Sequence, residues 1–146
     1  MNQLEDCFEK GLAHFKSGNY SEAVRWYRKA AEQGNRKAQY WLGISYLGGH
    51  GIASDNLMAF HWINKAAEQG DGDSLCFLGA CSVDGLKGFI QRDMTEAYKF
   101  FIHAHAAGQE NADGWIKLLH ASLSPQELAE GEQRAREYCI QPTQPS

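Results

Sequence analysis

The chain has 146 residues, of which 43% are hydrophobic and 12% aromatic, and its formal net charge is −4. A chain of this length can bury roughly two-thirds of its unfolded surface, so we expect one domain over residues 1–140 and a frayed tail at 141–146. The acidic balance gives no general attraction to nucleic acid or to anionic lipid. The first residues carry neither a basic flank nor an apolar run, so we expect no signal peptide, no membrane span and a cytoplasmic location.

An internal repeat organises the predicted elements. Residues 29–34 recur without change at 65–70, and self-similarity at a fixed period is typical of stacked units. Around this segment, apolar residues recur at three- and four-residue intervals, which corresponds to one face of a helix. The spacing predicts helices, in chain order, over 2–16, 20–33, 36–47, 55–69, 73–83, 93–107, 110–121 and 124–139. They pair into units at about 2–34, 36–70, 72–108 and 110–139.

Glycines punctuate the repeat at two places. One glycine recurs inside the first helix of the first three pairs, as Gly11, Gly43 and Gly79. A glycine inside a helix costs about 1 kcal/mol relative to alanine, so its recurrence indicates close helix packing at that point. Another glycine follows the second helix of these pairs, as Gly34, Gly70 and Gly108, and suits a left-handed helix end.

The last predicted helix, 124–139, differs from the others. Ser124 as cap, Pro125 at the first helical position and Glu127 three residues after the cap form a strong helix start. The segment lacks the aromatic pair of the earlier second helices and is rich in Glu, Gln and Arg. This composition is typical of a terminal cap, whose outer face meets water.

The central unit carries a recognisable pattern: Leu42-Gly43, Tyr46, Gly49, Gly51-Ile52, Asp55, Ala59, Trp62, Ala66-Ala67 and Gly70. This pattern resembles the Sel-one-like repeat, a relative of the tetratricopeptide repeat, and the resemblance covers about 5–120. It implies an all-α fold, an α-solenoid of about eight helices with a right-handed superhelical turn and a concave groove. It also implies a scaffold or adaptor of bacterial style whose partner is a protein or peptide.

No motif for catalysis, cofactor binding or metal binding is present. Cys76 and Cys81 lie five positions apart, which is poor geometry for a bridge within a helix, and Cys7 and Cys139 add no shared spacing. We therefore expect free thiols in a reducing compartment. His103 and His105 point to opposite sides of a helix, and His61 lies on a helix flank. We interpret His14 and His120 as packing residues, and leave His50 in a turn unassigned.

Two acidic residues and one basic cluster invite a functional interpretation. Asp55 and Asp93 stand at helix starts and are interpreted as caps rather than catalytic acids. The basic cluster consists of Arg25, Arg28, Lys29, Arg36 and Lys37. It is either a solvated face or a site for an acidic partner.

The first helices of the units should line the concave groove. The residues that the register places on this wall are Phe8, Leu12, Lys37, Tyr40, Trp41, Ile44, Leu47, Cys76, Ala80, Val83 and Leu118. Such a wall is apolar and aromatic, and suits an amphipathic helix or an extended apolar segment. The alternative is that some of these residues, Trp41 in particular, belong to the core.

Three functions follow as hypotheses. The favoured one is a non-catalytic interaction module, an adaptor or a neutralising partner of a toxin or effector, that grips a protein segment. The second, implied by the family resemblance, is an enzyme of the β-lactamase-related repeat type. The third is a structural subunit that forms a homo-oligomer through an uncapped face.

Overall fold

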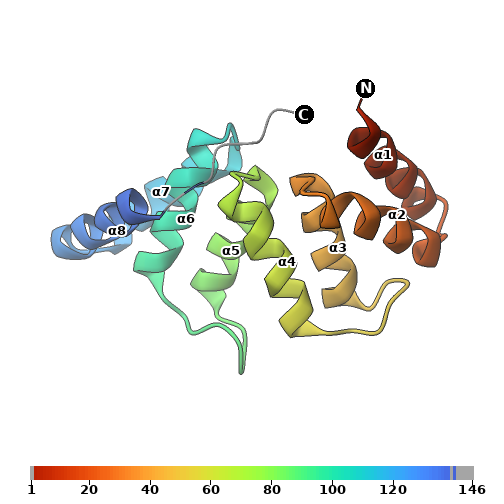
Figure 1. Ribbon diagram of the computed structural model, residues 1–146. Coiled ribbons are helices and arrows are strands. Elements are labelled where there is room, and N and C mark those ends of the chain that lie inside the picture. The colour runs from red at the N-terminus through yellow and green to blue at the C-terminus, as the bar shows by residue number, and fades with distance from the viewer. Residues whose placement is uncertain (1, 139, 141–146) are drawn as a thin grey trace. The chain divides into compact units, whose positions relative to one another are not determined.

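The computed structural model describes residues 2–138 and 140, and within them the chain forms eight α-helices and no β-strand. The helices are α1 (Gln3–Lys16), α2 (Tyr20–Glu32), α3 (Arg36–Gly48), α4 (Asn56–Glu68), α5 (Gly72–Asp84), α6 (Met94–Ala106), α7 (Asn111–Ser122) and α8 (Pro125–Glu137) (Figure 1). The predicted all-α class is confirmed, and each helix end lies within about two residues of its predicted position. Cys139 and the predicted frayed tail, 141–146, lie outside the described residues.

The chain divides into two compact units. The first ends at Gln69 and contains α1 to α4, and the second begins at Gly70 and contains α5 to α8. In the first unit α1 packs against α2, α2 against α3 and α3 against α4; in the second, α5 packs against α6 and α6 against α7. This is the pairing of a helical-repeat solenoid. A single domain over 1–140, the superhelical hand and a continuous groove concern both units together and stay predictions.

Short polar side chains start most of the helices. The side chains of Asp55 and Asp93 accept hydrogen bonds from the backbone N–H groups of Met58 and Glu96, at 3.1 and 3.0 Å. Both acids are therefore helix caps, as predicted. Ser124 closes the predicted capping box of α8, in which its hydroxyl and the Glu127 carboxylate each bond the other residue's backbone.

The recurring glycines inside α1, α3 and α5 let the helices of each pair approach closely. A Cβ atom on Gly11 would lie 2.7 Å from the Tyr27 ring, and one on Gly79 would lie 2.8 Å from the Phe101 ring. No real Cβ makes contacts this short, so only glycine fits at these points. The close packing predicted from the recurrence of glycine is confirmed.

The core of the first unit lies where α1, α2, α3 and α4 meet. Its buried members are Cys7, Phe8, Ala23, Val24, Tyr27, Ala30, Ala31, Ala38, Leu42 and Trp62. Alanines let the backbones approach, while Tyr27, which is 0% exposed, fills the space between helices with its ring. The Tyr27 hydroxyl is buried without a hydrogen-bond partner among the described residues, and burial raises its pKa.

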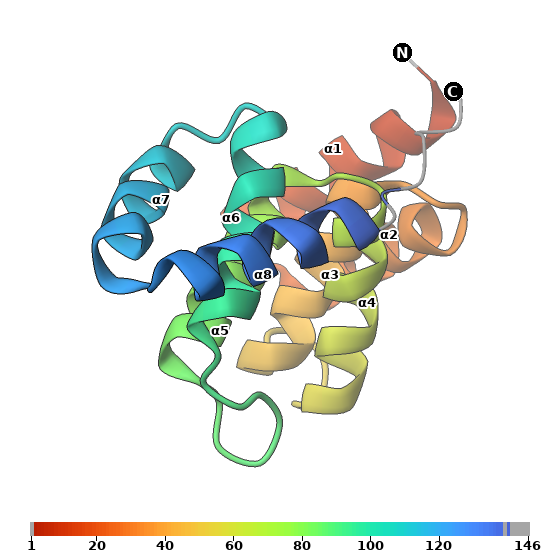
Figure 2. The same ribbon diagram turned by 90° about the vertical axis from the view of Figure 1, so that its left-hand side faces the viewer.

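In the second unit, α8 turns back and packs across α6 (Figure 1, Figure 2). A Cβ on Gly131 would lie 2.5 Å from Cδ1 of Tyr98, so a glycine is needed at this crossing. Arg134 of α8 donates to the carboxylates of Asp93 and Glu96, both at 3.0 Å. Gly131 and Arg134 therefore hold α8 on α6.

A second set of contacts surrounds Lys99 of α6. Its side chain is buried and its Nζ pairs with Glu96. The same Nζ lies 4.2 Å from the ring centre of Phe100 and 4.6 Å from that of Tyr138, which follows α8. The ammonium thus sits against two aromatic faces, an arrangement that compensates the loss of water.

No helix within residues 2–138 combines the length and the apolar character that a membrane span requires.

Candidate functional site

The clearest candidate surface in the first unit is a row of residues on α3. Tyr40, Ile44 and Leu47 are spaced by four and three positions, so they lie on one face of the helix; we call them the α3 stripe. All three are half-buried, whereas Leu42 and Ser45, on another face of α3, are buried. The α3 stripe therefore offers part of an aromatic ring and two aliphatic side chains to solvent. Lys37, one turn before Tyr40, is exposed.

Of the predicted groove residues on α1, one is exposed less than expected. Phe8 is 7% exposed, and its ring centre lies 5.9 Å from that of Tyr27 in the core. Leu12 is half-buried and packs against the same core. Phe8 therefore has little surface to offer a partner, and we leave it out of the binding surface proposed below.

Trp41 is a half-buried residue that packs against the core from its edge. Its ring lies 5.2 Å from Phe15 in an edge-on contact and 6.1 Å from Tyr27 in a stacked one. The sequence left open whether Trp41 belongs to the groove wall or to the core. In the structure it contributes to the packing between α1 and α3, and part of its side chain stays exposed. The ring of Tyr40 stands edge-on to Trp41 at 6.1 Å.

The second unit repeats the row with smaller side chains. Cys76, Ala80 and Val83 occupy the corresponding positions on α5, and all three are half-buried; we call them the α5 stripe. Leu118 on α7 is 53% exposed. Burial, and then the neighbouring Asp73 carboxylate, raise the pKa of the Cys76 thiol. The raised pKa favours the protonated thiol over the thiolate, and this disfavours a nucleophilic role for Cys76.

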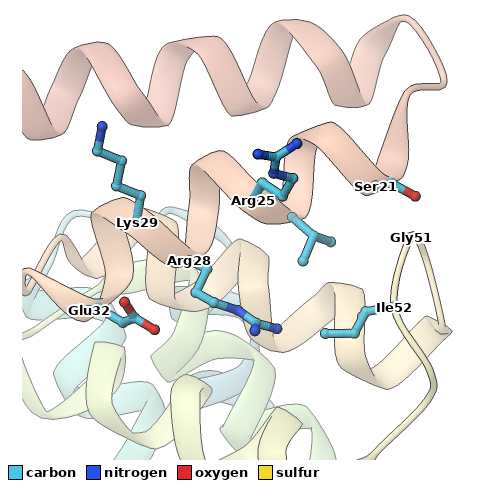
Figure 3. Close-up of a pocket in the computed structure, with 8 residues that line it drawn as sticks. Ser21, Arg25, Arg28, Lys29, Glu32, Gly51 and Ile52 are labelled. Carbon is cyan, nitrogen blue, oxygen red and sulfur yellow. The ribbon is translucent and has the colours of Figure 1, made fainter.

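The sequence did not predict a depression that lies beside α2. It is lined by Ser21, Val24, Arg25, Arg28, Lys29, Glu32, Gly51 and Ile52, and its volume is about 530 Å³ (Figure 3). We call it the α2 depression. Gly51 has a φ of +75°, and a Cβ on it would lie 2.3 Å from the carbonyl carbon of Tyr20, so the turn before α4 lies directly against the start of α2. Ile52, the next residue, packs against the core to which α2 contributes.

Three of the five predicted basic residues line the α2 depression, namely Arg25, Arg28 and Lys29. Arg28 extends from α2 toward Ile52 (Figure 3) and donates to the hydroxyl of Tyr46 at 3.0 Å. The other two predicted members are not part of its lining. Of these, Arg36 donates to the backbone carbonyl of Gln69 at 3.0 Å.

Two of the histidines considered above make structural contacts. Nε2 of His103 lies 2.8 Å from the carbonyl oxygen of Ala135, and Nε2 of His120 lies 2.8 Å from the hydroxyl of Tyr98. Cys7, Cys76 and Cys81 are free thiols. Among the described residues, no group of three or more His, Cys, Asp or Glu side chains is arranged to hold a metal ion.

A family comparison identifies the repeat. The model of the Sel1 repeat matches the chain three times, at residues 6–35, 36–71 and 72–107. These boundaries agree with the first three helix pairs. Residues 108–146, which include α7 and α8, follow the last match.

Solved structures with the same fold include two from bacteria. One is a protective antigen of uropathogenic Escherichia coli strains, described as displaying an SLR fold, with a TM-score of 0.82 and 28% sequence identity. The matched region covers 94% of this chain and 30% of the antigen chain. The other is a Sel1 repeat protein from Oxalobacter formigenes, with a TM-score of 0.75 and 27% sequence identity. The matched region covers 91% of this chain and 59% of the Oxalobacter chain.

Two curated proteins match a shorter part of the chain, and both are named exopolysaccharide production negative regulators. The one from Rhizobium leguminosarum bv. viciae is 38% identical over 55 residues, which is 38% of this chain and 21% of that protein. The one from Rhizobium meliloti (strain 1021) is 42% identical over 53 residues, or 36% of this chain and 20% of that protein. The match therefore spans about a fifth of the length of these relatives.

Proposed function

Because the chain belongs to the Sel1 repeat family, whose members are generally protein-interaction modules, we propose that it is a non-catalytic adaptor that binds a segment of a partner protein. The partner contacts the exposed sides of the first helices of the repeats. In the first unit this surface is the α3 stripe with Leu12 and Lys37. In the second unit it is the α5 stripe with Leu118.

The α3 stripe carries the proposal. Tyr40, Ile44 and Leu47 stay half-exposed beside the buried core of the same unit, so part of each side chain is open to a partner. A tyrosine that is already ordered by its neighbours is a good anchor, because it loses little conformational freedom on binding. Burial of the apolar parts of the stripe would contribute about 25 cal/mol per Å², less the cost of ordering the partner.

The role in the cell that this binding serves is regulatory. Support comes from the two Rhizobium relatives, whose names describe negative regulators, although the match spans only about a fifth of each. Neutralising a toxin or effector is one form of such regulation. The free thiols of Cys7, Cys76 and Cys81 support a reducing, cytoplasmic location in a bacterial cell.

The proposal is tested by capture with matched variants. Tagged wild-type protein, Tyr40→Ala/Ile44→Asp and Leu57→Asp are used to capture partners from the native cell, and the partner is then purified and titrated against each. Leu57 of α4 is 74% exposed and lies off the α3 stripe, so Leu57→Asp adds the same charge at an unrelated apolar position.

We expect one dominant partner to bind wild type and Leu57→Asp equally, and to lose at least tenfold in affinity for the double variant. Circular dichroism and thermal unfolding must show that the double variant is folded. Equal affinity for all three proteins would refute the α3 stripe as the binding surface. Enzymatic turnover that one polar substitution abolishes would refute the non-catalytic assignment.

A further inference from the structure

We infer that the α2 depression is a second docking surface, which takes an acidic segment of a partner protein. Arg25, Arg28 and Lys29 all belong to α2, and all three line one open depression of about 530 Å³. Among the described residues, Arg25 pairs with Glu22 at 2.9 Å, while Arg28 and Lys29 form no ion pair. Two positive charges therefore remain available to carboxylates from outside the chain.

Arg28 is held in place before any ligand arrives. Its Nη2 donates to the Tyr46 hydroxyl at 3.0 Å, so a neutral group orients the guanidinium without cancelling its charge. The side chain reaches toward Ile52, across the space between α2 and the turn that contains Gly51 (Figure 3). An oriented guanidinium keeps several N–H donors for a carboxylate, which it can bind with two hydrogen bonds.

The repeat itself does not require these charges. The next sequence repeat begins 36 positions later. The residues equivalent to Arg25, Arg28 and Lys29 in it are His61, Asn64 and Lys65. Helix α4, which carries these residues, packs against α3 just as α2 packs against α1. Lys29 and Lys65 even share their local contact, since each Nζ lies over a tryptophan ring, at 5.5 and 5.3 Å. The two arginines are therefore particular to the depression.

The spacing and the lining describe the ligand. Arg25 and Lys29 are about 6 Å apart along the helix axis. The Arg25–Glu22 pair is largely exposed and therefore weak, so Arg25 can exchange Glu22 for an incoming carboxylate. Two carboxylates have a similar separation when they are four residues apart in a helix, or two apart in a strand, at about 6.6 Å. Ile52, which is half-buried, gives the depression an apolar portion that suits an aliphatic side chain between the carboxylates, and the buried Val24 lies behind it.

Nucleic acid fits this surface less well than an acidic peptide. Glu22 and Glu32 stand beside the three cations, and the whole chain has a net charge of −4. A regular row of phosphates would meet these carboxylates at every register, whereas a peptide can place its acids only opposite the cations.

The test uses a short labelled peptide with glutamates four residues apart and leucines between them, and a matched peptide with glutamine for glutamate. Fluorescence anisotropy measures binding to wild type, Arg28→Gln, Lys29→Gln and Lys65→Gln. Lys65→Gln removes the same charge from the same repeat position outside the depression, and is the matched control. A labelled single-stranded DNA forms the third probe.

We expect the glutamate peptide to bind wild type and Lys65→Gln alike, and to bind Arg28→Gln about tenfold more weakly. Lys29→Gln should lose less, because an ammonium binds a carboxylate as a point charge and not with two oriented hydrogen bonds. Added salt should weaken all of these complexes. Tighter binding of DNA, equal binding of the glutamine peptide, or an unchanged affinity in Arg28→Gln would each overturn the inference. The Tyr40→Ala/Ile44→Asp variant should bind the glutamate peptide normally, so this surface and the α3 stripe can fail independently.

Discussion

Gly43 of α3 lies so close to Ile63 of α4 that a Cβ on the glycine would stand 2.5 Å from Cγ1 of the isoleucine. The same Cβ would stand 2.8 Å from the backbone oxygen of Ala59, which cannot rotate away. A bulky residue on the second helix thus fills the space that a missing side chain leaves on the first. This complementarity fixes how the two helices of a pair can approach.

Gly43→Ala should therefore destabilise the protein by about 1–3 kcal/mol, since overpacking outweighs the better helix propensity of alanine. Urea unfolding followed by circular dichroism measures the change. Gly114→Ala in α7 is the control, because a Cβ there meets no atom within 4 Å. It should stabilise the helix by up to about 1 kcal/mol. A neutral Gly43→Ala would show that the pair α3–α4 can open without loss.

Tyr27→Phe should leave the stability unchanged or raise it slightly. The hydroxyl is buried without a hydrogen-bond partner among the described residues, so its removal saves desolvation and loses no bond. The equivalent positions in the next two repeats are Ile63 and Phe101, which have no hydroxyl. Thermal unfolding of the two proteins decides the matter. A loss of more than about 1 kcal/mol would instead indicate a bound water on the hydroxyl.

Gly131→Ala should loosen α8 from α6. The new methyl group would collide with the Tyr98 ring and approach the Thr95 carbonyl, at 2.5 and 3.3 Å. We expect faster hydrogen exchange across 125–137 and little change in α1 to α4, because the effect is local. Alanine at exposed Gln126 of α8 is the control and should leave exchange in α8 as it is. Unchanged exchange in Gly131→Ala would mean that the helix is not held at this crossing.

Acid should weaken the attachment of α8 through Asp93. Partial burial tends to raise the pKa of Asp93, but the Glu96 backbone N–H and the Arg134 guanidinium outweigh it, and the pKa lies below its usual value of 3.8. A carboxyl with a lowered pKa contributes stability above its unfolded pKa and loses that contribution as the pH falls through the folded one.

The acid-dependent loss should therefore occur below about pH 4 and be smaller in Arg134→Gln, which lacks the pair already. The two side chains are 34% and 41% exposed, so solvent screening limits the difference to at most about 1 kcal/mol. Melting temperatures of both proteins, measured from neutral pH downward, test this expectation. Parallel curves for the two proteins would rule out the Asp93–Arg134 pair as the source of the acid sensitivity.

Much of the fold was predictable because its signals are local. Asp55 and Asp93 cap helices through contacts three residues away, and the helix-ending glycines Gly34, Gly70 and Gly108 have positive φ angles. Even the pairing of helices was visible, since a glycine that recurs at one register position implies a close neighbour. Such features depend on a few adjacent residues and on the period of the repeat.

The candidate surfaces were predictable only in part. The register placed Tyr40, Ile44 and Leu47 on one face of α3, where the structure finds them half-exposed. The same register placed Phe8 of α1 at the position equivalent to Tyr40 on the predicted groove wall. In the structure, however, Phe8 is buried against Tyr27. Helical spacing says which residues share a face, but the depth at which a face lies depends on the helices that cover it.

The amino-acid sequence by itself determined the helices, their caps and the glycines at which paired helices touch, because each of these rests on local conformational preference or on repetition. Only the tertiary structure decided that α8 lies on α6 and that the turn at Gly51 closes against α2 beside three cations. These arrangements join residues that are distant along the chain. Their energies come from packing and charge, which no local pattern of residues specifies.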